Sequence, residues 1–160
     1  MVFDFEKYVI DIDVEKTAAY HQKDSRITCD CLGCRNFDRT VTELPPEILA
    51  FFEKLGVDPA KPEVLSIDYA PSKETMAYSG CYYLCGRMLR GENPWKQVSA
   101  GCFQLDERYS LSLGQNFFVW FSEPCHGILD PAFPKPVLEM QFSCILPWWM
   151  EQPHSYHNYL

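Results

Sequence analysis

From residue 63 onward the chain reads as one strand-like segment after another, and this succession constrains the fold more than any other feature of the sequence. The segments are rich in apolar, aromatic and β-branched residues, and turn-forming residues separate them. The predicted strands are residues 64–69, 76–89, 98–104, 109–113, 117–121 and 137–146. Because no helical stretch separates them, parallel crossover connections are disfavoured. We therefore expect a mainly β, α+β fold built on an antiparallel β-sandwich or barrel.

Helical periodicity is confined to the first part of the chain. Residues 8–14 alternate as a strand with one wetter face, and Asp13 can then cap a short helix over residues 14–20. A second helix is predicted over residues 44–55, with proline in its first turn and Gly56 suited to end it. We therefore expect two short helices and a cysteine-rich loop near the N-terminus.

The chain length of 160 residues suffices for one hydrophobic core, because folding at this length buries roughly two-thirds of the unfolded surface. Residues 1–150 are therefore predicted to form a single globular domain. Residues 151–160 combine histidines with tyrosines and show no clear period, so we expect a loosely held C-terminal tail.

The charge balance is acidic, with 14 Lys and Arg residues against 22 Asp and Glu residues and a formal net charge of -8. The average field would repel a phosphate backbone or an anionic membrane surface, so we expect no nucleic-acid partner and no membrane partner. No segment approaches the roughly 20 apolar residues that span a bilayer, and the N-terminus lacks the pattern of a secretory signal. We expect a cytoplasmic protein with a protein or small-molecule partner that the sequence does not identify.

Three of the eight cysteines are clustered, and in a reducing cytoplasm they are expected to be thiols or metal-bound thiolates. Cys29, Cys31 and Cys34 place three sulfurs within six residues, ahead of a short helix predicted near residues 36–40. Thiolates are ligands that Zn²⁺ prefers. If Cys34 lies in the first helical turn, the helix dipole and Arg35 would lower its pKa. Three interpretations stay open: a structural zinc site, plain structural thiols, and a redox or catalytic use of Cys31 and Cys34.

A zinc site would need a fourth ligand. The candidates are His21, Cys125, His126, and either Cys81 or Cys85. The last two cannot serve one ion together or form a disulfide on an extended strand, because four residues of strand separate them by about 13 Å. We expect Cys81 and Cys85 to be small buried residues on one strand face, and Cys102 and Cys144, which adjoin phenylalanines, to lie in the core.

Three other pairs carry side chains capable of acid-base or nucleophilic chemistry, namely Cys125 with His126, Asp11 with Asp13, and Asp106 with Glu107. Cys125 and His126 adjoin in a Pro/Gly turn, where neighbouring side chains usually point apart, so a surface turn is favoured. Asp11 and Asp13 would lie about 7 Å apart on one strand face, and an exposed strand edge accounts for them. The nucleotide-binding, zinc-protease and nucleophile-elbow motifs do not occur in the sequence.

Aromatic residues make up 15% of the chain, and most are expected in the core because alternation on strands buries one face. Trp148 and Trp149 are the exception, since adjacent strand residues face opposite ways and one ring should be comparatively exposed. Such a ring offers a binding surface for a partner. The alternative is that Pro147 breaks the strand and lets both rings fold back on the core.

Three segments follow one another in the chain: residues 17–20, the pattern C-x-C-x-x-C-R-N-F that starts at Cys29, and the pattern L-G-V-D-P-x-K-P over residues 55–62. In this order they resemble a small uncharacterised protein family of Gram-positive bacteria, with the similarity spanning residues 11–89. The resemblance implies a bacterial cytosolic setting. It implies no activity, cofactor or partner.

Two classes of function remain. We favour a non-enzymatic binding or interaction protein, with zinc as the candidate cofactor at the cysteine cluster, because the sequence offers one sulfur cluster and no assembled set of acid, base and nucleophile. The alternative is a thiol-redox or metal-dependent enzyme that uses Cys31 and Cys34.

Overall fold

The computed structural model describes residues 1–23, 29–123 and 131–156. In these residues seven strands form one antiparallel sheet in the order β1-β2-β4-β9-β8-β7, and β3 pairs with β4. The sheet strands are β1 (Val2–Phe5), β2 (Tyr8–Ile12), β3 (Val64–Ser72), β4 (Thr75–Arg90), β7 (Leu111–Gly114), β8 (Phe117–Ser122) and β9 (Val137–Pro147). The long strand β4 organises the sheet, because its first half pairs with β3, its last residues pair with β2, and β9 pairs along Thr75 to Cys85.

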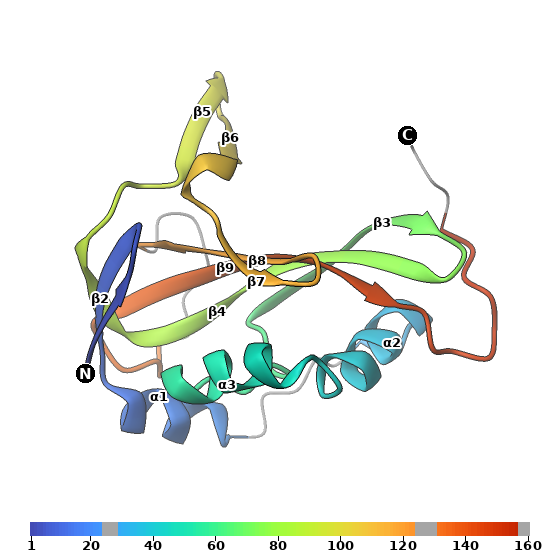
Figure 1. The fold of residues 1–160 in the computed structure, drawn as a ribbon, viewed down its shortest axis with the longest axis horizontal. Helices are drawn as coiled ribbons and strands as arrows, with labels where there is room; N and C mark the ends of the chain where they lie inside the picture. The colour runs from blue at the N-terminus through green and yellow to red at the C-terminus, as the bar shows by residue number, and fades with distance from the viewer. Residues whose placement is uncertain (24–28, 124–130, 157–160) are drawn as a thin grey trace.

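Helices cover one face of this sheet, and a separate hairpin projects from the other side (Figure 1). The helices are α1 (Val14–His21), α2 (Leu32–Val41) and α3 (Pro46–Leu55), and the hairpin is formed by β5 (Trp95–Ser99) and β6 (Cys102–Leu105). The predicted α+β, mainly β fold is confirmed. The sheet is not closed into a barrel, and in the described residues its second layer consists of three helices. Two of them correspond to the two predicted helices, and α2 contains the short helix predicted near residues 36–40.

The ends of α1 and α3 follow the predicted local signals. Asp13 caps α1 by accepting a hydrogen bond from the backbone N–H of Lys16 over 3.0 Å. At the end of α3, Gly56 has a φ of 73°, and a side chain there would meet the carbonyl oxygen of Val14 at 2.5 Å. Glycine therefore permits both the left-handed turn and the close approach of α1. No helix in the described ranges is long and apolar enough to cross a membrane.

The core lies between the sheet and the helices and is largely aromatic. Tyr82 of β4 and Phe142 of β9 lie with their ring centroids 5.1 Å apart, and Phe52 of α3 packs against Tyr82 at 5.2 Å. Phe37 of α2 meets Tyr78 of β4 edge-on at 5.2 Å. All five rings are buried. Burial of each ring contributes about 1.5–3 kcal/mol, so apolar packing holds α2 and α3 on the sheet.

The strand predicted over residues 98–104 is wrong, because the chain turns within it and forms the β5–β6 hairpin. The turn includes Gly101, whose φ is 73°. Cys102 is exposed and Phe103 is 43% exposed, so the prediction that Cys102 lies in the core is also wrong. The hairpin projects beyond the sheet, on the side away from the helices (Figure 1). Cys144, by contrast, is buried as predicted.

After β9 the described chain contacts the turn between β3 and β4. The backbone N–H of Trp148 donates to the carbonyl oxygen of Glu74 over 2.7 Å. His154 Nε2 lies 3.0 Å from the carbonyl oxygen of Ser72. Residues 157–160 lie outside the described residues, so a loosely held tail over 151–160 stays a prediction.

Candidate metal centre

The start of α2 gathers the three clustered cysteines. The Sγ atoms of Cys29, Cys31 and Cys34 all lie within 4.8 Å of one another. A tetrahedral site with Zn–S bonds of about 2.3 Å needs sulfurs about 3.8 Å apart. Each pair therefore has to close by at most about 1 Å, which side-chain rotation can supply. The three sulfurs are close enough to ligate one metal ion.

Cys31 is the N-cap of α2, and its Sγ accepts a hydrogen bond from the backbone N–H of Cys34 over 3.5 Å. The helix begins at Leu32, earlier than the helix predicted near residues 36–40. Burial opposes ionisation of the Cys31 thiol. Hydrogen bonds from the backbone of Cys34, from the two neighbouring thiols and from the backbone of Gly33 outweigh burial and lower the pKa of Cys31. Negative charge in the cluster is therefore stabilised at the cap.

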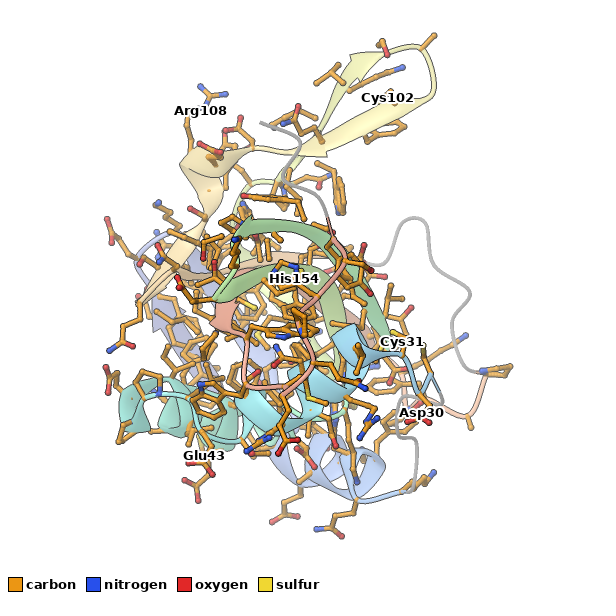
Figure 2. The ribbon with its side chains drawn as sticks, turned by 90° about the vertical axis from the view of Figure 1, so that its right-hand side faces the viewer. Asp30, Cys31, Glu43, Cys102, Arg108 and His154 are labelled. Atoms are coloured by element: carbon orange, nitrogen blue, oxygen red, sulfur yellow. The ribbon has the colours of Figure 1, made fainter. Side chains whose placement is uncertain are left out.

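The Cys34 thiol differs from that of Cys31. Burial raises the pKa of Cys34 to about 12, and hydrogen bonding with Cys31 and Cys29 and their negative charge act in the same direction. The prediction that the helix dipole and Arg35 would lower this pKa is wrong, because burial dominates. Arg35 instead extends toward Asp30, with 3.9 Å between the Nε of Arg35 and the Oδ1 of Asp30. Figure 2 shows Asp30 and Cys31 together at the start of α2.

Tyr156, near the C-terminus, borders the cluster. Burial raises the pKa of Tyr156, and so do the negative charge on Cys31 and a hydrogen bond between the two side chains. The Tyr156 hydroxyl also lies against Gly33, where an added Cβ would approach it to 3.0 Å. A hydroxyl in this position can donate to a thiolate at Cys31. The C-terminal segment thus supplies a polar partner for the sulfur cluster.

Asn36 anchors α2 through hydrogen bonds made below the surface. Its Nδ2 donates to the Tyr78 hydroxyl over 3.1 Å and to the carbonyl oxygen of Pro147 over 3.0 Å. Its Oδ1 accepts from the backbone N–H of Trp149 over 2.8 Å. The Tyr78 hydroxyl in turn donates to the carbonyl oxygen of Gly33 over 2.7 Å. This network ties the first turns of α2 to β4 and to the segment after β9.

The predicted fourth ligands that the structure describes do not join the three sulfurs. His21 is buried at the end of α1, with its Nε2 3.1 Å from the carbonyl oxygen of Tyr83; burial lowers its pKa. Cys81 and Cys85 are buried on β4 in a second apolar cluster, which includes Tyr20 and Tyr83. Their predicted role as small buried residues is confirmed.

Two of the predicted pairs of acid-base or nucleophilic side chains have different outcomes, namely Asp11 with Asp13 and Cys125 with His126. Asp13 is occupied as the cap of α1, and Asp11 lies 3.9 Å from the guanidinium of Arg87. Both carboxylates thus have structural partners. Cys125 and His126 lie outside the described residues, so their placement in a surface turn and their candidacy as metal ligands stay predictions.

The two adjacent tryptophans differ in exposure. Trp148 packs against the core, meets the ring of His154 edge-on at 5.1 Å, and donates from Nε1 to the carbonyl oxygen of Gln152 over 2.8 Å. Trp149 is 42% exposed. It lines a groove of 480 Å³ with Leu44 and other residues of the α2–α3 connection. One ring is therefore comparatively exposed, but β9 ends at Pro147, so strand alternation is not the cause. The use of Trp149 as a binding surface stays a prediction.

Sequence reasoning did not identify Tyr156 or Asn36 as part of this centre. Asn36 lies among buried positions of α2 spaced three or four residues apart, which include Gly33, Phe37 and Thr40. A polar residue within such a stripe indicates a buried hydrogen-bonding role. The contact of Tyr156 with the cluster has no local signal, because it depends on the path of the chain after β9.

Comparisons with protein-family models, curated proteins and solved structures found no match for this chain. Its candidate function is therefore inferred from the arrangement of its side chains.

Proposed function

We propose that the protein is a cytoplasmic, non-enzymatic binding protein that contains a structural Zn²⁺ ion held by Cys29, Cys31 and Cys34. The observation that carries this proposal is the convergence of the three Sγ atoms within 4.8 Å at the N-terminus of α2. Soft thiolate ligands favour zinc, and binding would require all three thiols to lose their protons. The positive ion would offset the burial that opposes ionisation of Cys34.

A structural role fits the position of the cluster. Cys29 precedes α2, while Cys31 and Cys34 belong to its cap and first turn, so one ion would link the incoming chain to the helix. The hydroxyl of Tyr156 would donate to the Cys31 thiolate as an outer partner, as hydrogen-bond donors around metal ligands commonly do. A fourth protein ligand would complete the coordination, as structural zinc sites require. The ion would thus stabilise the packing of α2 on the sheet.

The test is the zinc content of protein purified without a metal-affinity column. We expect about one zinc ion per chain by mass spectrometry of the metal, because three thiolates and one further ligand complete a tetrahedral site. Joint replacement Cys31→Ser and Cys34→Ser should abolish zinc binding. The matched control is Cys102→Ser, since Cys102 is an exposed thiol on the β5–β6 hairpin, far from Cys31 (Figure 2). Zinc that survives the double replacement, or wild-type protein that takes up no zinc under reducing conditions, would contradict the proposal.

A second candidate function, disulfide reduction, is favoured by the contrast between Cys31 and Cys34. A partly exposed thiol with a lowered pKa precedes by three residues a buried thiol with a raised pKa, an arrangement suited to attack and resolution. The Cys31 thiolate would attack a substrate disulfide and expel one substrate sulfur as a thiolate. Cys34 would then lose its proton and displace the other sulfur, so that the chain gains a Cys31–Cys34 disulfide and the substrate becomes two thiols.

Turnover of a small aromatic disulfide in the presence of dithiothreitol separates the two functions. The binding proposal expects no catalysis above the dithiothreitol background from the zinc-loaded protein. The reductase candidate expects turnover that Cys31→Ser abolishes, and a mixed disulfide on Cys31 that accumulates in Cys34→Ser. Cys102→Ser again serves as the control and should leave the result unchanged in either case.

A further inference from the structure

A groove of 410 Å³ is lined by residues of β3, β4, β8 and β9. The helices cover one face of the sheet (Figure 1). On β8, Phe117 and Phe121 belong to the core beneath the sheet, so the alternate residues Phe118 and Trp120 face the other side. Both line the groove, together with Tyr69 of β3. Its volume is within the range of pockets that hold small ligands.

The three aromatic side chains of this groove differ in burial. Trp120 is only 6% exposed, and its Nε1 donates to the carbonyl oxygen of Asp106 over 3.0 Å. Tyr69 and Phe118, from strands on either side of β4 and β9, are 38% and 37% exposed. The groove thus has one buried ring that is held by a hydrogen bond and two partly exposed rings that a ligand can contact.

Two carboxylates accompany these rings. Asp68 of β3 accepts a hydrogen bond from the Ser79 hydroxyl over 3.0 Å, and Glu107 lies in the short 3-10 helix η1 (Glu107–Tyr109). None of the described lining residues is basic. The nearby Arg108 forms a two-point contact with Asp106, with 2.6 Å between its Nη2 and Oδ2, and points outward (Figure 2). The groove therefore combines two carboxylates with aromatic surface. The one cation recorded against its described lining is Lys7, whose Nζ donates to the backbone carbonyl oxygen of Ser110 over 2.7 Å.

We propose that this groove binds a small organic ammonium cation. An ammonium group is attracted both by carboxylates and by the faces of aromatic rings, whereas the two carboxylates would repel an anion and would gain no favourable contact with a purely apolar ligand. The net charge of -8 would also raise the local concentration of a cationic ligand. This inference specifies a ligand class for the proposed binding role, and it does not rest on zinc.

The experiment titrates choline into isotope-labelled protein and follows the backbone amide resonances. The comparison ligand is the uncharged isostere of choline in which a tert-butyl group replaces the trimethylammonium group. We expect saturable shifts centred on Phe118, Trp120 and Glu107. The isostere should bind at least about tenfold more weakly, because it keeps the shape of choline but not the charge that faces the rings and carboxylates.

Two variants of the groove and two matched controls complete the test. Glu107→Gln and Phe118→Ala alter exposed or half-exposed side chains, and each should weaken choline binding about threefold to tenfold. Glu92→Gln and Phe103→Ala alter exposed residues outside the groove and should leave the affinity unchanged. Melting curves of all four variants establish that they fold.

Equal binding of choline and its isostere, or shifts that map outside the groove, would overturn the proposal. Failure of choline together with saturable binding of a lysine-rich peptide would also overturn it and would identify the groove as a protein-docking surface. The zinc content of the same preparation tests the proposed metal centre separately, because none of the three clustered cysteines lines the groove. Choline binding can therefore fail while zinc binding persists, and the reverse.

Discussion

Replacement of Asn36 by alanine tests whether the buried hydrogen bonds of α2 hold the candidate metal centre in place. The variant loses two hydrogen bonds donated by Nδ2, to Tyr78 and Pro147, and one accepted by Oδ1 from Trp149. The Tyr78 hydroxyl keeps its bond to Gly33. The backbone N–H of Trp149 loses the acceptor that Asn36 supplied.

The expected loss of stability follows from this inventory. Three hydrogen bonds at about 1 kcal/mol each amount to about 3 kcal/mol. The unsatisfied N–H of Trp149 adds about 1 kcal/mol, and the better helix propensity of alanine returns about half of that. We therefore expect Asn36→Ala to lower the free energy of unfolding by about 3.5 kcal/mol, which corresponds to a fall of about 7–14 °C in Tm for a chain of this size.

Urea unfolding followed by circular dichroism and tryptophan fluorescence measures this loss. The control is Thr42→Ala at the exposed C-cap of α2, where we expect a change within about 0.5 kcal/mol. A loss below about 1 kcal/mol in Asn36→Ala would refute the reasoning, since it would mean that packing of Phe37 and Val41 alone positions the helix. Unchanged zinc content in a clearly destabilised variant would show that the cluster does not depend on this anchor.

The remaining predictions concern the sheet, a buried histidine and the tryptophan pair. Gly80→Ala should lower stability by about 3 kcal/mol, because the added Cβ would overlap the carbonyl oxygen of Val64 on the neighbouring strand; a near-normal Tm would argue against this clash. Burial lowers the pKa of His21 below its ordinary value of 6.5, so the unfolded state takes up the proton first as the pH falls. The free energy of unfolding should therefore decrease below about pH 6.5, and urea titrations of His21→Gln should show a weaker pH dependence. The same pH dependence in the variant and the wild type would exclude His21 as its source. Trp148→Ala should destabilise by about 3 kcal/mol, while Trp149→Ala should leave Tm nearly unchanged and weaken capture of a partner; destabilisation by both would remove Trp149 as a binding surface.

Local signals account for the parts of the fold that could be predicted. Asp13 caps α1 and Gly56 ends α3 because each acts on backbone groups within a few residues. The β5–β6 hairpin was missed because alternation alone does not distinguish one strand from two strands joined by a tight turn. Gly101 in that segment was the available signal. The choice between a second sheet and a layer of helices depends instead on which apolar surface covers β4, and that is a non-local property.

The same distinction between local and non-local causes applies to the candidate metal centre. The convergence of Cys29, Cys31 and Cys34 follows from their spacing, because a turn into a helix brings the cap and first turn together whatever the rest of the chain does. The chemistry of the individual sulfurs does not follow from spacing. Cys34 is hard to ionise because α2 is packed against the sheet, and Tyr156 reaches Cys31 only because the chain folds back after β9. A cysteine motif therefore predicts where a soft ion can be held, whereas the protonation of its thiols requires the tertiary structure.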